Sequence, residues 1–408
     1  MYENLETSFL QLYPKFEIIF SAADEDDQAL AVARELITKY PHIDARIMTG
    51  ASTSPFLYVF LASNEQPGEH DVGVNPKVNN LMKPYHAAKY DILWVLDSNV
   101  QIVPDALARS VDALNKPSER RIGLVHHVPV VPTYELTAEV GTRIEQAFLN
   151  TNHAKMYIAI NTLAIDSCVM GKSNMYRRSD VDRLTGTLRP TVPKPSLSPT
   201  ASEHAPMGFA VFGKFLAEDN MLASALWHEL GLRHDLGSDV AVNSLGSMSF
   251  GAYAARRARW IRVRKWMTFA PTLLEPFSES VFVGTLVALA VSHLTHGTVP
   301  AWVFFPTHMA AFLAIDLAVR DTLVGEPLQG DEWWAFVRAW AMREFMAFPI
   351  WLFGMLGNEV DWRGGKYRIL RNGETRRVEK AGWRTRIGRW IRDLVTGRPD
   401  GYEPVSGE

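Results

Sequence analysis

The sequence predicts an α/β domain with a mostly parallel sheet, followed by a helical region that is embedded in a membrane. Two observations support this prediction. Over residues 1–270, short apolar runs alternate with helical patterns, which is typical of a sheet with helices on both faces. From about residue 275 onward, long apolar stretches replace this alternation. We therefore expect an α/β domain over residues 1–270, a membrane-embedded region over 275–357 and a basic tail over 358–408.

The first part of the α/β domain contains the clearest elements. Strands are predicted at three short apolar runs, residues 16–21, 45–48 and 92–96. Apolar residues at helical spacing over 28–40 predict a helix that ends before Pro41. Asp24 and Asp97 each come just after a predicted strand. Because ligands bind beyond the carboxyl ends of the strands in such sheets, we expect both carboxylates to lie near a binding site.

Two stretches look like insertions into this domain. Residues 51–71 combine an apolar run with a polar tail and interrupt an otherwise compact unit. Residues 189–207 are rich in Pro and Ser, a composition that predicts a surface loop.

Three apolar segments are candidates for membrane helices: Val281–Val291, Val299–Val319 and Phe345–Leu356. The second is long enough to cross a bilayer, although it contains Pro306 and Asp316. The alternative is that these segments are buried core helices of a soluble domain. The basic flanks at residues 256–265 and 363–392 favour a membrane, because such segments lie against anionic headgroups. Basic flanks at both ends predict an even number of crossings, whereas the candidate segments number three. We therefore expect one segment to be re-entrant or to lie in the interface.

The overall composition excludes several classes of protein. The formal net charge of −3 provides no basic field for binding nucleic acid. Cys168 is the single cysteine, which excludes a disulfide framework within the chain and suits a reducing compartment. Residues 1–15 lack the basic and apolar regions of a signal peptide. The sequence also lacks a P-loop motif and zinc-type Cys/His spacing.

Four features that can carry chemistry follow one another along the chain. They are Asp24 after a strand, Asp97 after a strand, Glu218-Asp219 at the start of a helical run, and Arg256-Arg257-Ala258-Arg259-Trp260 before the membrane region. This order resembles the D, D, D, (Q/R)XXRW signature of glycosyltransferases that make lipid-linked sugars and polysaccharides.

The resemblance extends to the ceramide glucosyltransferase family of fungal type. Segments similar to that family include Asn4-Leu5-Glu6-Thr7, Tyr13-Pro14-Lys15, Asn75-Pro76-Lys77-Val78-Asn79-Asn80-Leu81-Met82, Gly123-Leu124-Val125-His126, Glu275-Pro276 and Ser278-Glu279. The resemblance implies a GT-A-like, Rossmann-type domain that binds a nucleotide sugar. It also implies UDP-glucose as the donor, ceramide as the acceptor, glucosylceramide as the product and inversion at the anomeric carbon. Finally, it implies a multi-pass protein of the Golgi membrane with its active site on the cytosolic side.

The resemblance assigns a role to each acidic position. Asp24 would bind the uridine part, although its acidic cluster also suits a solvated turn, and Asp26 or Asp27 could be the true counterpart. Asp97 would hold a divalent metal, Mg or Mn, that neutralises the leaving diphosphate, and its alternative role is a helix N-cap. Asp219 would be the catalytic base, and its alternative is an acid favoured by the helix dipole.

The RXXRW segment is expected to contact both substrates. Arg256 and Arg259 would clamp diphosphate oxygens, and Trp260 would form the floor of the acceptor site by apolar contact. A basic juxtamembrane helix with an interfacial Trp is an alternative that is compatible with these roles.

Three further positions match the family. Lys77 lies where the family places a contact on the nucleotide side. His153 matches a position near the acceptor pocket, and a structural hydrogen-bonding role is an equal alternative. Cys168 and residues 171–173 match a segment that lines the same cleft, and the thiol itself is expected to pack in the core.

The sequence differs from the family pattern in two places. The family has an anchor helix and a first sheet strand before the segment similar to Asn4-Leu5-Glu6, so we expect an exposed sheet edge and a smaller nucleotide pocket here. The family also joins the counterparts of residues 50 and 72 almost directly, so we interpret 51–71 as a translated intron or gene-model artefact. Transcripts that lack this stretch would support the interpretation, and peptides from within it would contradict it.

Two other functions are compatible with the same residues. One is transfer of another sugar, or transfer to another lipid or to a polysaccharide, although a processive polymerase needs more membrane spans. The other is a truncated, non-catalytic membrane protein that keeps the fold. The sequence does not indicate an oligomeric state.

Overall fold

The computed structural model describes residues 1–49, 58–60, 72–133, 137–188, 207–362 and 365–378. Most of the two predicted insertions, and the part of the basic tail beyond residue 378, therefore lie outside the described residues. Among the described strands, eight form one sheet in the order β2-β1-β3-β4-β7-β6-β8-β5. Their bounds are β1 (Glu17–Ala22), β2 (Asp44–Thr49), β3 (Tyr58–Phe60), β4 (Ile92–Asp97), β5 (Val100–Gln101), β6 (Ile122–Val130), β7 (Ser173–Arg177) and β8 (Arg233–Asn243).

The predicted strands are confirmed to within a residue or two, but the prediction of a mostly parallel sheet is wrong. The β1–β2 and β6–β8 pairs are parallel, and the other pairs among the described strands are antiparallel. In particular, β7 enters between β4 and β6 and runs against both. Apolar runs report burial on both faces of a strand, and β6 is buried along its whole length. Burial of this kind is independent of strand direction.

Strand β1 is paired on both of its sides among the described strands. Strand β3 lies between β1 and β4 and pairs antiparallel with both of them. Its residues belong to the stretch that we interpreted as an insertion. Because β3 is antiparallel to both of its neighbours, β1 and β4 run in the same direction. Their carboxyl ends therefore lie at the same edge of the sheet.

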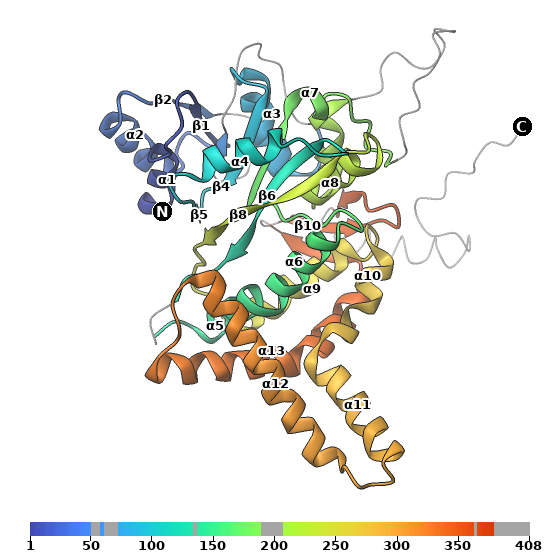
Figure 1. Cartoon of the computed structure of the whole chain (residues 1–408). Coiled ribbons are helices and arrows are strands. Elements are labelled where there is room, and N and C mark those ends of the chain that lie inside the picture. The colour runs from blue at the N-terminus through green and yellow to red at the C-terminus, as the bar shows by residue number, and fades with distance from the viewer. Residues whose placement is uncertain (50–57, 61–71, 134–136, 189–206, 363–364, 379–408) are drawn as a thin grey trace, which may run out of the picture.

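Helices cover both faces of the sheet, as the sequence predicts (Figure 1). One layer contains α1 (Tyr2–Phe9), α2 (Gln28–Lys39) and α4 (Ala106–Asn115), and the other contains α3 (Pro76–Ala87), η2 (Gly208–Lys214) and α8 (Glu218–His228). Alternate strand residues enter different layers, so that Trp94 and Leu96 pack in the first and Leu93 and Val95 in the second. The predicted helix over 28–40 is α2, and Asp27 caps its start.

A second group of helices packs against one end of the sheet. It is built from α5 (Val140–Phe148), the π-helix η1 (Leu149–His153), α6 (Ala154–Leu163) and α9 (Phe250–Arg264). Shorter elements are α7 (Arg178–Val181), α10 (Phe269–Leu274) and η3 (Glu275–Ser278). Phe148 of α5 and Tyr253 of α9 share one apolar core with α12 (Ala301–Val324) and α13 (Gly330–Leu356).

The apolar segments predicted for the membrane are helical. Helix α11 (Ser280–Leu294) and α12 form a hairpin that projects away from the sheet, with the connecting turn farthest from it (Figure 1). By length and composition, α12 alone among the described helices can cross a membrane, or two spans exist if the pair 269–278 and 280–294, bent by 63°, counts as one. Only 6% of the apolar window of α12 is buried, which is contrary to the alternative of a core helix.

The start of the predicted basic tail forms a small sheet that the sequence did not predict. Strands β9 (Glu359–Trp362), β10 (Gly365–Ile369) and β11 (Thr375–Arg377) are antiparallel in the order β11-β10-β9. Val360, Tyr367 and Ile369 pack on Val263 of α9. This small sheet therefore supports the helix that carries the RXXRW segment.

Candidate active site

Asp97 is the last residue of β4, and two lysines bind its carboxylate. Lys77 Nζ lies 3.1 Å from Oδ1, and Lys172 Nζ lies 2.9 Å from Oδ2. Burial by itself would raise the pKa of Asp97, but the ammonium groups of Lys172 and Lys77 outweigh it and lower the pKa to about 2. Asp97 is therefore ionised throughout the physiological range of pH.

Secondary structure places both lysines beside this strand end. Lys77 lies in the first turn of α3, where the side chain of Asn75 caps the helix by accepting a hydrogen bond from Lys77 N at 2.8 Å. Lys172 comes immediately before β7, the partner of β4, and Asp97 N donates to Lys172 O at 3.2 Å. The charged cluster is therefore built by a helix cap and a strand pairing rather than by a flexible loop.

Asp219 lies at the start of α8 and faces the same cluster. Its neighbour Glu218 forms an ion pair with Lys77, with 3.2 Å between Oε1 and Nζ, and accepts a hydrogen bond from Asn75 Nδ2 at 2.7 Å. Burial raises the pKa of Asp219 to about 7, and the nearby charge of Glu218 adds to the shift. A carboxylate with a pKa near neutrality can accept a proton at physiological pH, which is the property required of a general base.

Gly171 allows the two key charges of the site to approach each other. A Cβ atom at this position would lie 2.6 Å from Asp219 Oδ2 and 3.1 Å from Lys77 Nζ. Lys77 Nζ also donates to Gly171 O at 3.1 Å. Any larger residue would therefore displace the Asp219 carboxylate or the Lys77 ammonium.

Two oxygen ligands of the kind that Mg²⁺ and Mn²⁺ prefer converge near the end of β4. Lys172 Nζ lies 2.9 Å from Asp97 Oδ2 and 3.1 Å from Asn99 Oδ1, so a cationic group already occupies the point where these oxygens meet. The residues therefore fit a divalent cation in part. No group of three or more His, Cys, Asp or Glu side chains able to hold a metal is found in the described part of the chain. The other ligands would have to come from the substrate and water.

The RXXRW segment lies on α9, next to this cluster. Arg256 Nε is 2.8 Å from Glu145 Oε1, and its guanidinium lies 5.0 Å from the Trp260 ring. Burial lowers the pKa of Lys172, and the positive charge of Arg256 lowers it further. The two cations are therefore neighbours. Arg259 lies nearly one turn after Arg256 and is partly exposed.

Trp260 belongs to an aromatic cluster with His153. Their ring centroids are 6.3 Å apart, and the His153 ring stacks on Tyr157 at 5.4 Å. Burial, together with the charges of Arg257 and Arg264, lowers the pKa of His153 to about 3, so its imidazole is neutral. His153 Nδ1 is buried and has no hydrogen-bond partner among the described residues. It lies at the end of a π-helix, an irregularity that is frequent at functional sites.

Asp24 is not brought into this cluster by any described contact. Its side chain is exposed, and Asp24 Oδ1 accepts a hydrogen bond from Asp26 N at 3.0 Å in the turn after β1. The turn does lie at the same sheet edge as Asp97, with β3 between the two strands.

Sequence reasoning missed three residues of the site: Lys172, Tyr157 and Glu145. Lys172 lies within the segment 171–173 that we associated with the cleft. The sequence around a single lysine does not indicate which carboxylate it pairs with in the fold. Tyr157 is within electrostatic reach of Asp219, which links the aromatic cluster to the carboxylate. Cys168 is different, because burial raises the pKa of its thiol to about 11, which agrees with a packing role.

Comparisons with known proteins identify relatives of the chain. The model of glycosyl transferase family 21 matches residues 1–56, 64–190 and 205–375. A ceramide glucosyltransferase of Komagataella phaffii is 38% identical over 417 residues, which cover 90% of this chain and 79% of that protein. The ceramide glucosyltransferase of Candida albicans is 31% identical, with coverage of 90% and 84%. That of Gibberella zeae is 30% identical, with coverage of 95% and 84%. The gaps in the family match, 57–63 and 191–204, fall within the two predicted insertions.

Proposed function

The chain belongs to glycosyl transferase family 21, and from this premise we propose that it transfers glucose from UDP-glucose to ceramide, forming glucosylceramide with inversion. We also propose that its α/β domain is GT-A-like. One observation carries the proposal: Asp219, with a pKa near 7, lies beside the cluster of Asp97, Lys77 and Lys172. Such a cluster offers a base for an acceptor hydroxyl beside positive charge for a leaving diphosphate.

The first role of the cluster is to stabilise the leaving group. Lys77, Lys172 and Arg256 would surround the diphosphate of the donor, since all three cations lie close to the end of β4. Asp97 and Asn99 would hold a divalent cation, Mg²⁺ or Mn²⁺, which neutralises diphosphate charge when it is bound. Arg259 would add a second guanidinium from α9, and Asp24 would bind the uridine part at the same sheet edge.

The second role is proton transfer at Asp219. Its carboxylate would remove the proton from the primary hydroxyl of ceramide as that oxygen attacks the anomeric carbon of glucose. The new bond joins the acceptor oxygen to this carbon, and the bond from the carbon to the diphosphate oxygen breaks. UDP leaves with the electron pair on the opposite face, so the configuration inverts. Trp260 and neutral His153 would form the floor of the acceptor site.

The membrane assignment is also a proposal. The exposed apolar side chains of the α11–α12 hairpin support insertion in a bilayer, where ceramide is dissolved. We propose a multi-pass protein of the Golgi membrane with the site on its cytosolic side. Protease protection of intact vesicles that contain the full chain tests the orientation. Cleavage of the α/β domain from outside the vesicle is expected, and protection would contradict the cytosolic assignment.

A substrate panel tests the proposed reaction. Membranes that contain the full chain are incubated with UDP-glucose or UDP-galactose and with ceramide, diacylglycerol or a sterol as the acceptor. We expect glucosylceramide as the main product, with the β configuration that inversion of an α-linked donor requires. A larger yield from another donor or acceptor would replace this assignment. Absence of transfer to every acceptor would favour a non-catalytic membrane protein.

A further inference from the structure

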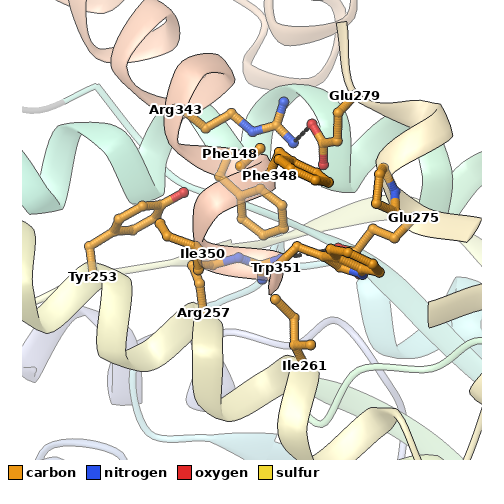
Figure 2. Close-up of a pocket in the computed structure, with 12 residues that line it drawn as sticks. Phe148, Tyr253, Arg257, Ile261, Glu275, Glu279, Arg343, Phe348, Ile350 and Trp351 are labelled. Atoms are coloured by element: carbon orange, nitrogen blue, oxygen red, sulfur yellow. Dashed lines mark ion pairs between the residues drawn. The ribbon is translucent and has the colours of Figure 1, made fainter. Parts of the chain in front are cut away.

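A hollow that is partly open to solvent lies between α9, η3 and α13 (Figure 2). It is separate from the charged cluster at Asp97. Its wall includes Glu275, Pro276 and Glu279, which belong to the family-like segments that have no role in the reaction described above. These segments therefore require another explanation.

The charged side chains that line the hollow are balanced. Arg343 Nη2 lies 2.6 Å from Glu279 Oε2, and Arg257 Nη2 lies 3.7 Å from Glu275 Oε1 (Figure 2). The lining thus provides two cations and two anions, with no surplus positive charge for a phosphate. A neutral molecule with several hydrogen-bonding groups matches this lining better than an anionic headgroup does.

Arg257 has an unused donor in this hollow. The residue is only 5% exposed, and its Nη1 atom has no hydrogen-bond partner among the described residues. The side chain extends from α9 toward Trp351 (Figure 2). Leaving a buried donor unpaired is costly, so an acceptor oxygen from a bound molecule is expected at this position.

One wall of the hollow is apolar and continues to the outer surface of the helices. Phe348, Ile350 and Trp351 of α13 line it. Phe348 is itself 36% exposed, and Leu352, one helical turn farther along α13, is an exposed apolar side chain. The apolar wall therefore reaches the outer surface of α13, where a hydrocarbon chain can leave the hollow.

The hollow also adjoins the aromatic cluster of the candidate active site. Phe148 lines the hollow, and its ring centroid lies 5.5 Å from that of His153 and 6.3 Å from that of Trp260. The guanidinium of Arg257 lies over the same Phe148 ring at 3.6 Å. The polar head of a lipid held here would lie close to Trp260 and His153, the residues assigned to the floor of the acceptor site.

We propose that this hollow holds the acceptor lipid where its chains join its polar head. Arg257 Nη1 donates a hydrogen bond to the amide oxygen of the lipid, and the chains pass along Phe348 and Trp351 to the membrane. The primary hydroxyl then extends past Phe148 toward His153 and Asp219. This inference rests on the proposed function, because it takes ceramide as the acceptor.

Filling the hollow tests the inference by kinetics. In full-length protein, Ile350→Trp is compared with Leu356→Trp, which adds the same side chain at the exposed last residue of α13, a position that does not line the hollow. We expect Ile350→Trp to raise the KM for short-chain ceramide at least about tenfold while the KM for UDP-glucose stays within about twofold. Leu356→Trp should leave both KM values unchanged. An unchanged ceramide KM in an active Ile350→Trp protein would overturn the inference.

Photolabelling of the unsubstituted chain gives a test that does not depend on the folding of a variant. The probe is a ceramide with a diazirine in the acyl chain near the amide, presented in vesicles. Labelled peptides are expected from α9, η3 or α13, and unlabelled ceramide should compete. Labelling confined to other segments, or competition by anionic phospholipid as strong as that by ceramide, would overturn the inference. A chain labelled as expected that transfers no glucose would contradict the proposed function and leave the lipid site standing.

Discussion

At the scale of single residues, the candidate active site depends on how closely opposite charges can approach. Asp219 and Lys77 both lie against Gly171, a position with no room for a Cβ atom. Burial and Glu218 hold the pKa of Asp219 near 7, whereas two lysines hold the pKa of Asp97 near 2. Two carboxylates in one cleft thus acquire different properties, one suited to accept a proton and the other to remain charged.

The pKa of Asp219 predicts how activity depends on pH. The base must be unprotonated to act, and its fraction in that form rises as pH increases through about 7. We therefore expect kcat/KM for ceramide to increase with pH and level off above about pH 8. At pH 5 it should be roughly a hundredfold below the plateau, because the pH is then about two units below the pKa. A profile that is flat between pH 5 and 8 would contradict a catalytic base with a pKa near 7.

Gly171→Ala tests the close approach of the charges. The added methyl group would meet Asp219 Oδ2 at 2.6 Å, so the carboxylate must move away from its position. Because a displacement of about 1 Å can reduce a rate about a hundredfold, we expect a loss of that order in kcat. The control is Gly246→Ala, at an exposed glycine where an added Cβ has no atom within 4 Å. Equal kcat values for the two variants would contradict the account.

At the scale of elements, three of the eight described strands of the main sheet and part of the candidate site could be predicted from the sequence. Apolar runs locate β1, β2 and β4, and Asp97, which ends β4, lies in the charged cluster of the candidate site. Strand direction could not be predicted, because the burial of β7 is the same in either orientation. Lys172 and the hollow at Arg257 could not be found either, because each depends on contacts between segments distant in the sequence.

The contact between α12 and η1 connects the apolar helices to the candidate active site. Lys155, just after the π-helix, forms an ion pair with Asp316 of α12, and Trp340 Nε1 donates to Asp316 Oδ2 at 2.7 Å. The side chain of Asp316 is fully buried. The residue that looked unsuitable for a membrane helix in the sequence is therefore one that attaches α12 to the α/β domain.

Asp316→Ala tests this attachment. Removing one partner leaves the Lys155 ammonium without its carboxylate, and breaking a buried ion pair typically costs about 3 kcal/mol or more. We expect a clearly lower melting temperature for the purified protein in detergent. Asp331→Ala, at an exposed position in the first turn of α13, is the control and should melt close to the parent. Equal melting temperatures for both variants would show that the pair does not stabilise the junction.

At the scale of the whole molecule, the chain is an α/β domain with a cluster of carboxylates and lysines at the end of β4, set on helices with exposed apolar surfaces. This arrangement suits a reaction between a water-soluble nucleotide sugar and an acceptor dissolved in a bilayer. The hollow at Arg257 lies between the two parts, next to Trp260 and His153. Family membership supports the same reaction, since the relatives at 30–38% identity are ceramide glucosyltransferases.

Removal of divalent cations tests the metal at Asp97. Transfer by the intact, membrane-bound chain is measured after treatment with a chelator and again after Mg²⁺ or Mn²⁺ is added. We expect at least about a tenfold loss of rate on chelation and recovery with either ion, because the ion neutralises charge on the leaving diphosphate. Undiminished transfer in the chelator would mean that Lys77 and Lys172 neutralise the diphosphate by themselves.

The most direct measurement is the transfer of labelled glucose from UDP-glucose to ceramide by membranes that contain the full chain, beside membranes with the Asp219→Asn variant. The account predicts labelled glucosylceramide from the parent and a rate at least about a hundredfold lower from the variant, since the amide cannot accept the proton. Photolabelling by the ceramide probe should be retained in the variant, which shows that it is folded. Equal transfer by the two proteins, or no transfer by the parent, would contradict the central claim.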